Sequence, residues 1–319
     1  MFTKKLIIIL IIVGILLELL WGNTWLLLLK GNFPILNDIL FYFRIPRISN
    51  ALISGIGLAV SGLILQTIFH NPLAGPYVLG ISNGAALGVA LSVLLLGLSK
   101  PFVSYFSSFF FAIIGALCVI FILSLLVKHY SPVAIIITGV LLAGIFSAII
   151  NILQFLAPAI AVKNFVIWTM ASLDMSNYTI ISLNLILIIL IIIILYKKSN
   201  VLDTFYLGEE YAQTMGINTK KQRFFLILMV GIIITLLTAS YGPLAFVGVI
   251  APHLARWFSK KHNHKTLLTN SILSGILIIL WSDFLSHASN VNIPINSILS
   301  LMGLPVLLIL ILQRKYDLY

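Results

Sequence analysis

Residues 48–99 read ISNALISGIGLAVSGLILQTIFHNPLAGPYVLGISNGAALGVALSVLLLGLS, a stretch of 52 residues without Asp, Glu, Lys or Arg. A membrane span needs about 20 apolar residues to cross roughly 30 Å of hydrocarbon, so this stretch is long enough for two spans. The triplet His70-Asn71-Pro72 marks the turn between them, because proline disfavours continuation of a helix. Backbone groups in lipid must be satisfied within their own segment, so such continuous apolar runs predict transmembrane helices.

The rest of the chain follows the same pattern. Its 319 residues are 61% hydrophobic and 8% charged, with a mean hydropathy of +1.16, whereas soluble domains carry about a quarter charged residues. Together with an N-terminal run and the two spans within 48–99, the sequence predicts about ten transmembrane helices in an all-α polytopic membrane protein, with a single transmembrane domain over 1–319. The other apolar runs are 101–127, 132–162, 178–196, 224–241, 244–258, 267–287 and 295–313.

The basic residues predict the orientation. With ten crossings and a cytoplasmic N-terminus, only five of the 19 Lys and Arg residues lie outside: Lys30, Arg44, Arg47, Lys100 and Lys163. The remaining 14 lie inside. This asymmetry obeys the positive-inside rule. We therefore expect a multi-pass protein of the cytoplasmic membrane with both termini in the cytoplasm. The net charge of +11 follows from this sidedness, so we expect no nucleic-acid partner.

The N-terminal run resembles a signal peptide but lacks a small-x-small cleavage site, and Glu18, Trp21 and Trp25 follow it. We therefore expect it to remain as the first span.

The longest polar stretch is the predicted cytoplasmic loop at about 197–223. Within it Leu207, Tyr211 and Met215 recur at four-residue spacing, and Gly216 is a plausible helix stop. This pattern predicts a short amphipathic helix that either docks in a groove of a partner or lies on the membrane surface.

A set of short motifs carries a family resemblance when the motifs are taken in order and at their spacings. They are Arg44-Ile-Pro-Arg47, Gly57-Leu-Ala-Val-Ser-Gly62, Gln66-Thr67, Asn71-Pro-Leu-Ala74, Leu79-Gly-Ile-Ser-Asn-Gly84, Thr138-Gly-Val-Leu-Leu-Ala-Gly144, Leu207-Gly-Glu-Glu-Tyr-Ala212, Met215-Gly216, Gly242-Pro243, Phe246-Val-Gly248, Pro252-His-Leu-Ala-Arg256, Asp283 and Gly303-Leu-Pro305. From about residue 44 to residue 313 the chain resembles the FecCD family of ABC importer permeases, which move iron siderophores, haem or vitamin B12. A siderophore is the expected cargo, with haem or cobalamin as the alternatives.

The resemblance implies partners and a division of labour. Family permeases have ten helices and work in pairs, so we expect a second copy or a paralogue, an ABC ATPase dimer on the cytoplasmic face and a substrate-binding protein outside. This chain has no GxxxxGK[ST] phosphate loop, so ATP hydrolysis belongs to a separate chain and this one is a transport subunit, not an enzyme. The sequence predicts no catalytic residue, no cofactor and no metal site.

The resemblance also assigns roles to residues. Arg44 and Arg47 match the arginines that face glutamates of the binding protein, although interfacial arginines also snorkel to headgroups. His287 stands where the family often has arginine, so it is either a third docking group or an interfacial histidine with an ordinary hydrogen bond. The family's ATPase-coupling segment, two short helices, is matched by Gly208, Glu209, Glu210, Ala212 and Gly216. The two glutamates also suit a helix N-terminus.

Other positions allow structural as well as functional interpretations. Asn71, Pro72, Gly242 and Pro243 form either a hinge or gate at the membrane face or simply a turn and a helix break. The small residues from Gly55 to Gly62 predict close packing of helices. His262 and His264 lie in a Lys-rich loop and are expected to be solvated.

The sequence gives little support to two other functional classes of membrane protein. An ion-coupled secondary transporter usually carries intramembrane acids or bases, and Asp283 is the only candidate near a span's interior. An intramembrane enzyme needs a nucleophile–base pair or a metal cluster within the spans, and the sequence offers none.

Overall fold

The computed structural model describes residues 2–21, 23–30, 33–96, 101–127, 129–174, 177–259, 263–288 and 293–314, and over these ranges every regular element is helical. In chain order the helices are α1 (Phe2–Leu20), α2 (Asn23–Leu29), α3 (Phe33–Ile39), η1 (Leu40–Arg44), α4 (Ile45–Ile68), η2 (Pro76–Leu79), α5 (Ile81–Ala90), η3 (Leu91–Leu95), α6 (Pro101–Val127), α7 (Pro132–Leu156), α8 (Ala159–Thr169), α9 (Tyr178–Lys197), α10 (Ser199–Tyr206), α11 (Glu209–Thr214), α12 (Thr219–Tyr241), α13 (Val247–Phe258), α14 (His264–His287) and α15 (Ile295–Arg314). The prediction of an all-α chain is confirmed for these residues.

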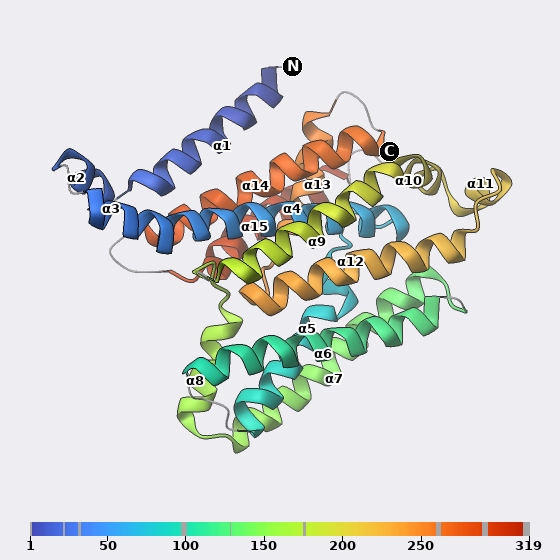
Figure 1. Ribbon diagram of the computed structural model, residues 1–319. Helices are drawn as coiled ribbons and strands as arrows, with labels where there is room; N and C mark the ends of the chain where they lie inside the picture. The colour runs from blue at the N-terminus through green and yellow to red at the C-terminus, as the bar shows by residue number, and fades with distance from the viewer. Residues whose placement is uncertain are drawn as a thin grey trace.

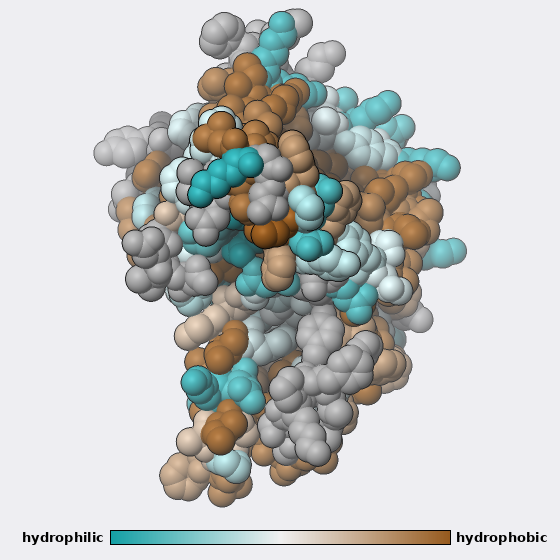
Figure 2. Space-filling model, turned by 60° about the vertical axis from the view of Figure 1, so that its left-hand side comes forward, coloured by the Kyte–Doolittle hydropathy of each residue, from teal (hydrophilic) through white to brown (hydrophobic). Residues whose placement is uncertain are grey.

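The helix lengths and the surface fit a membrane protein. Six helical stretches in the described residues are long and apolar enough to cross a membrane: Phe33–Ile68, Ser107–Val127, Pro132–Leu156, Tyr178–Lys197, Thr219–Tyr241 and His264–His287. Figure 2 shows broad hydrophobic areas on one face of the molecule. Large apolar side chains point outward, for example Phe155 at 88% exposure and Ile160 at 72%. Such a surface suits lipid as its solvent.

The helices form two groups that lie one below the other in Figure 1. In the upper group α4 packs against α9, α12, α13 and α14, and α1 lies along α14. In the lower group α5 packs against α6 and α7, and α12 joins the groups by contacting α5 and α6. In α4, 19 of 24 residues are buried, whereas only three of 25 are buried in α7, so α4 is the central helix of the upper group.

Glycines set how closely the central helices approach. A Cβ added at Gly55 would lie 2.7 Å from the carbonyl oxygen of Gly275, so α4 and α14 touch backbone to backbone. A Cβ at Gly62 would overlap the carbonyl oxygen of Gly248 in α13. Small residues at such crossings are typical of membrane helix packing. The packing role predicted for Gly55 and Gly62 is therefore confirmed.

One predicted boundary is confirmed and another is wrong. The turn expected at His70-Asn71-Pro72 follows the end of α4, where His70 has a φ of 48°. The run 132–162 is not one helix, because α7 ends at Leu156 and α8 begins at Ala159. Proline disfavours helical backbone in the residue before it, and Ala157 is accordingly extended ahead of Pro158.

The Gly62 contact makes a testable prediction about stability. Replacing Gly62→Ala should destabilise the protein by on the order of 3 kcal/mol, because the new methyl meets backbone that cannot move aside independently of α13. Gly144→Ala is the matched control, since no atom of the described residues lies within 4 Å of a Cβ added at that helical glycine. Thermal unfolding of the purified variants in detergent measures both. Equal melting temperatures for the two variants would contradict the packing described above.

Candidate functional site

Charged side chains gather where α4 begins and α14 ends. Arg47, in the first turn of α4, donates from Nε and Nη2 to the two carboxylate oxygens of Asp283, at 2.8 and 2.9 Å. The Asp283 side chain is 1% exposed, so both of its oxygens are neutralised away from water by one planar guanidinium. Arg47 is thereby anchored to α14 and retains 19% of its own side-chain exposure.

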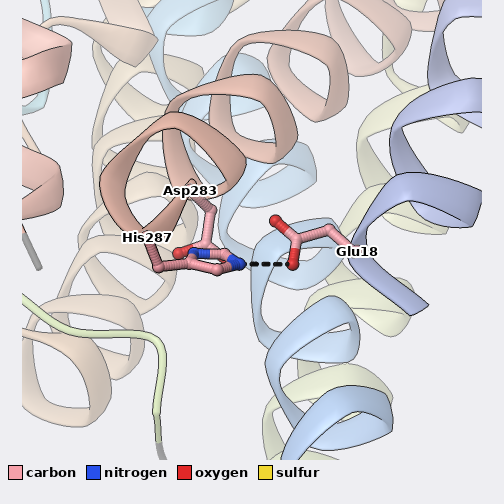
Figure 3. A group of neighbouring side chains, drawn as sticks. All are labelled: Glu18, Asp283 and His287. Atoms are coloured by element: carbon pink, nitrogen blue, oxygen red, sulfur yellow. Dashed lines mark ion pairs between the residues drawn. The ribbon is translucent and has the colours of Figure 1, made fainter. Parts of the chain in front are cut away.

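A second acid extends this arrangement to α1. Glu18 is 1% exposed; its carboxylate lies 3.0 Å from His287 Nε2 and 4.0 Å from Arg44 Nη1. Figure 3 shows Glu18 on α1 reaching toward His287, one turn beyond Asp283 on α14. Arg44 also donates to the carbonyl oxygen of Trp21 at 3.0 Å. We call the five residues Glu18, Arg44, Arg47, Asp283 and His287 the ion-pair cluster.

The ion-pair cluster contains three groups of metal-binding type. Ligand atoms of Glu18, Asp283 and His287 lie within 4.8 Å of one another. Arg47, however, already occupies both Asp283 oxygens, and Arg44 lies beside Glu18. Two guanidinium groups already balance two carboxylates, so an added divalent cation would gain little net attraction and would have to displace a bidentate ion pair. These contacts therefore describe an ion-pair network and disfavour a metal site.

The same end of the bundle carries an exposed acid and a pocket. Asp174, in the segment between α8 and α9, pairs with Nη1 of Arg47 while its side chain remains 67% exposed. A pocket of about 200 Å³ opens here, and Arg47, Asp174, Asp283 and Ser286 are among its lining residues. Arg47 is thus accessible from a hollow at the surface while it remains tied to the buried carboxylate.

Sequence reasoning missed two members of this end. Glu18 and Asp174 were not singled out as functional, and the expectation that Asp283 is the only acid inside a span is wrong because Glu18 is buried in α1. Glu18 is the only charged residue between Lys5 and Lys30, and an acid within an apolar run is a signal for a buried cationic partner. Asp174 gave no comparable signal.

The predicted coupling segment lies at the other end of α4, and Figure 1 shows α10 and α11 far from α2 and α3. The amphipathic helix expected from Leu207 to Met215 is shorter than predicted, since α11 spans only Glu209–Thr214. Gly208 separates it from α10 with a φ of 116°, a conformation that favours glycine. Gly216, with a φ of 79°, ends the segment as predicted. Leu207, Tyr211 and Met215 are 45–63% exposed.

The two glutamates of α11 have different environments. Glu209 forms an ion pair with Arg223 of α12, whose side chain is 3% exposed, and so fastens α11 to the bundle. Glu210 is exposed. Ala212 is fully buried beneath the short helix. One glutamate therefore positions the segment, while the other is available to a partner.

The prediction that His264 is solvated is wrong. Its side chain is 1% exposed, and its ring lies between Asp203 and Thr67. The Lys-rich sequence around it gave the opposite signal, because its partners are distant in the chain. His262 lies outside the described residues.

The predicted hinge positions are structured breaks. The Asn71 side chain accepts a hydrogen bond from the Leu73 amide at 3.0 Å, and the Pro72 carbonyl lies 2.8 Å from His253 Nε2. Gly242 ends α12 with a φ of 79°, and a Cβ there would lie 2.6 Å from the Trp168 carbonyl oxygen. These contacts account for the residue types as turn and helix-break residues, and the hinge role stays a prediction.

Between the two ends, the lower helix group carries a polar pocket of about 230 Å³. Asn83 of α5 with Asn151 and Gln154 of α7 give it three carboxamides, and none of its lining residues is charged. The lining consists of Tyr77, Ser82, Asn83, Ala86, Ser147, Ile150, Asn151, Gln154, Phe165, Thr169 and Pro243. Such a pocket can hydrogen-bond a passing solute without binding it through charge.

Comparisons with known proteins relate this chain to a family of membrane transport proteins. The model of the FecCD transport family matches residues 5–313. The chain is 31% identical over 300 residues to the molybdate import permease MolB of Haemophilus influenzae, covering 93% of this chain and 87% of that protein. It is 31% identical over 286 residues to the iron(3+)-hydroxamate permease FhuG of Bacillus subtilis, covering 87% and 84%. The hemin permease HmuU of Yersinia pestis is 30% identical over 276 residues, covering 85% and 82%.

A solved inward-facing structure assigned to the metal-chelate type of ABC transporter has a TM-score of 0.83 and 28% identity, covering 96% of this chain and 97% of that one. Permeases of this kind are transport subunits that work with separate ABC ATPases, which agrees with the absence of a phosphate loop and leaves no support for an ion-coupled secondary transporter. The chain belongs to the FecCD transport family and is an ABC importer permease.

Proposed function

We propose that this chain, with a second copy or a close paralogue, forms the membrane path of an iron-siderophore importer in the cytoplasmic membrane. A substrate-binding protein docks at the ion-pair cluster, at Arg44, Arg47 and His287. An ABC ATPase dimer docks at the coupling segment, residues 199–216, which contains Gly208, Glu209, Glu210, Ala212 and Gly216.

The observation that carries the proposal is the placement of the two candidate docking surfaces on the same pair of helices. Arg47 and Asp283 join the start of α4 to the end of α14, and Thr67 and His264 join the opposite ends of these helices. A partner at one surface is therefore mechanically connected to a partner at the other. An importer that couples external delivery to internal ATP hydrolysis needs such a connection.

The proposed topology has ten crossings and cytoplasmic termini. In support, each of the ten predicted apolar runs contains a helix of the structure: α1, α4, α5 with η3, α6, α7, α9, α12, α13, α14 and α15. Of these, Ile81–Leu95 and Ile295–Ile309 are shorter apolar helices, and α13 has 12 residues. With these crossings the basic residues remain concentrated on the cytoplasmic side.

The siderophore assignment rests on the polar pocket and on the named relatives. Carboxamides and hydroxyls can donate hydrogen bonds to the oxygen-rich surface of a ferric chelate, and the lining carries no charge that would retain it. FhuG is named for iron(3+)-hydroxamate. High affinity can then reside in the binding protein, while the path binds weakly enough to release its cargo.

Molybdate is the second candidate cargo, because MolB is named for molybdate import and an oxyanion accepts the same uncharged hydrogen bonds. Haem and cobalamin are less well matched to the pocket, whose lining offers only Tyr77 and Phe165 as aromatic surface.

Uptake by cells that lack the chain tests the cargo. We expect deletion to reduce uptake of a radio-iron-labelled ferric hydroxamate at least about tenfold, with molybdate, haem and cobalamin uptake unchanged, because only a cargo that passes between the permeases depends on them. Wild-type expression in trans should restore it. Loss of molybdate uptake with intact ferric hydroxamate uptake would show that the second candidate is the cargo.

The docking surface can be tested with changes that act in opposite directions. Arg44→Gln should weaken binding of the cognate substrate-binding protein by about 5-fold, since one rim charge contributes on the order of 1 kcal/mol. Buried Glu18 keeps His287, at 3.0 Å, as its nearer partner in this variant, whereas Arg44 lies 4.0 Å away. Asp174→Asn should strengthen binding by about 2-fold, because this exposed carboxylate competes for Arg47. Lys163→Gln, an exposed charge on α8, is the control. Biolayer interferometry at two salt concentrations measures all three.

Weaker binding by the Asp174→Asn variant would argue against docking at Arg47. We leave Arg47 itself unchanged in this test, because removing the partner of buried Asp283 costs about 3–5 kcal/mol and would confuse folding with docking.

The coupling surface makes a separate prediction. Tyr211→Ala and Glu210→Ala should each reduce co-purification of the ATPase at least about 5-fold without changing the melting temperature, because both side chains are exposed. Glu209→Ala should lower the melting temperature instead, because it leaves buried Arg223 without its carboxylate. Affinity purification with a tagged ATPase, paired with thermal unfolding of the permease, distinguishes the two effects. Normal ATPase recovery by the Tyr211→Ala and Glu210→Ala variants would argue against this surface.

A further inference from the structure

A buried histidine joins three helices beside the coupling segment. His264 is the first residue of α14; its Nδ1 lies 2.7 Å from Asp203 Oδ1 on α10, and its Nε2 lies 2.8 Å from Thr67 Oγ1 near the end of α4. The imidazole and the threonine are 1% and 2% exposed. These three residues, which we call the histidine bridge, therefore connect the coupling segment to both helices of the central pair.

Asp203 also completes the start of α14. The first backbone amides of a helix lack partners within it, and the side chain of Asn263, at the capping position, makes no capping hydrogen bond here. The His264 amide instead donates to Asp203 Oδ1 at 2.7 Å. One carboxylate of α10 thus binds both the backbone and the ring of His264, and a negative charge at this helix end is favourable.

A second histidine holds the same short helix. His70, just beyond α4, has Nε2 2.6 Å from the carbonyl oxygen of Phe205 in α10. Phe205 and Leu202 are fully buried beneath α10. Displacement of α10 would therefore pull on α4 through His70, and on both α4 and α14 through the histidine bridge. Because these contacts attach α10 directly to the two helices, the segments that connect it along the chain would not take up the movement.

The arrangement of Asp203, His264 and Thr67 resembles the order of groups in a hydrolytic triad, but its geometry is not that of a reactive site. The Thr67 hydroxyl also lies 2.9 Å from the Leu63 carbonyl oxygen, and it is almost inaccessible to solvent. A nucleophile must be able to reach its substrate. The contacts instead fix the positions of three backbones relative to one another.

We propose that the histidine bridge transmits movement of the coupling segment to α4 and α14 as a unit, so that Asp203, His264 and Thr67 are positioning residues for transport. This inference rests on the proposed function, because it assumes that the ATPase docks at α10 and α11. Buried hydrogen bonds of this kind are stiff, and loss of one partner leaves a polar group unsatisfied in a low-dielectric site. The histidine bridge is thus a rigid connection between α10, α4 and α14 that depends on three side chains.

The test uses the complete transporter, reconstituted in liposomes with its ATPase and its cognate binding protein. The readout is the factor by which the binding protein changes the ATP hydrolysis rate, which does not require the cargo to be known. Thr67→Val removes the hydroxyl at nearly constant volume, Thr67→Ser retains it as the matched control, and Asp203→Asn weakens the link on α10.

We expect basal hydrolysis within about 2-fold and melting temperature within a few degrees of wild type in the two Thr67 variants; Asp203 lies in the segment proposed to dock the ATPase, so its basal rate is not used as a criterion. The effect of the binding protein should fall at least about 5-fold in Thr67→Val and Asp203→Asn and stay within about 2-fold of wild type in Thr67→Ser. Retention of the full effect by Thr67→Val and Asp203→Asn would overturn the inference. A parallel loss of basal hydrolysis and stability in Thr67→Val would also overturn it, because the residues would then act only in folding. A wild-type complex that does not respond to the binding protein would instead overturn the proposed function.

Discussion

The close crossing of α4 and α14 is the contact on which the rest of the structure depends. At Gly55 and Gly275 the two backbones meet with no side chain between them. Association of helices in lipid gains little from the hydrophobic effect, so dense packing and buried polar contacts must supply the stability. Because the two helices are antiparallel, this crossing also places Arg47 beside Asp283 at one end and Thr67 beside His264 at the other.

Buried charged side chains lie beside partners both at one end of this contact and at the coupling segment. Arg47 neutralises Asp283, Glu18 lies between His287 and Arg44, and Arg223 meets Glu209. An isolated ion in this environment would be strongly destabilising, so each pair restricts where its two helices can lie. Glu18 and Asp283, the acids near the membrane interior, thus already lie beside guanidinium and imidazole groups. Their presence therefore does not indicate transport driven by an ion gradient.

The sequence was most informative where local chemistry decides structure. The charge-free stretch 48–99, the break at His70-Asn71-Pro72 and the stop at Gly216 were all recognisable, because apolar length, proline and glycine act over a few residues. Burial of His264 was not recognisable, since Asp203 and Thr67 are 61 and 197 positions away. The break at Pro158 shows the converse error, in which continuous hydrophobicity concealed a local backbone constraint.

These features also indicate where movement is easiest. The upper helix group is fixed at both ends of α4 and α14, whereas the lower group joins it mainly through α12 and the breaks that follow it. Gly242 and Phe246, both with positive φ, interrupt the backbone between α12 and α13, and Pro243 between them lines the polar pocket. In the proposed importer, the fixed helix pair would carry force between the partners. The neighbouring breaks would allow the walls of the pocket to change their separation, because backbone there is not held by a continuous helical ladder.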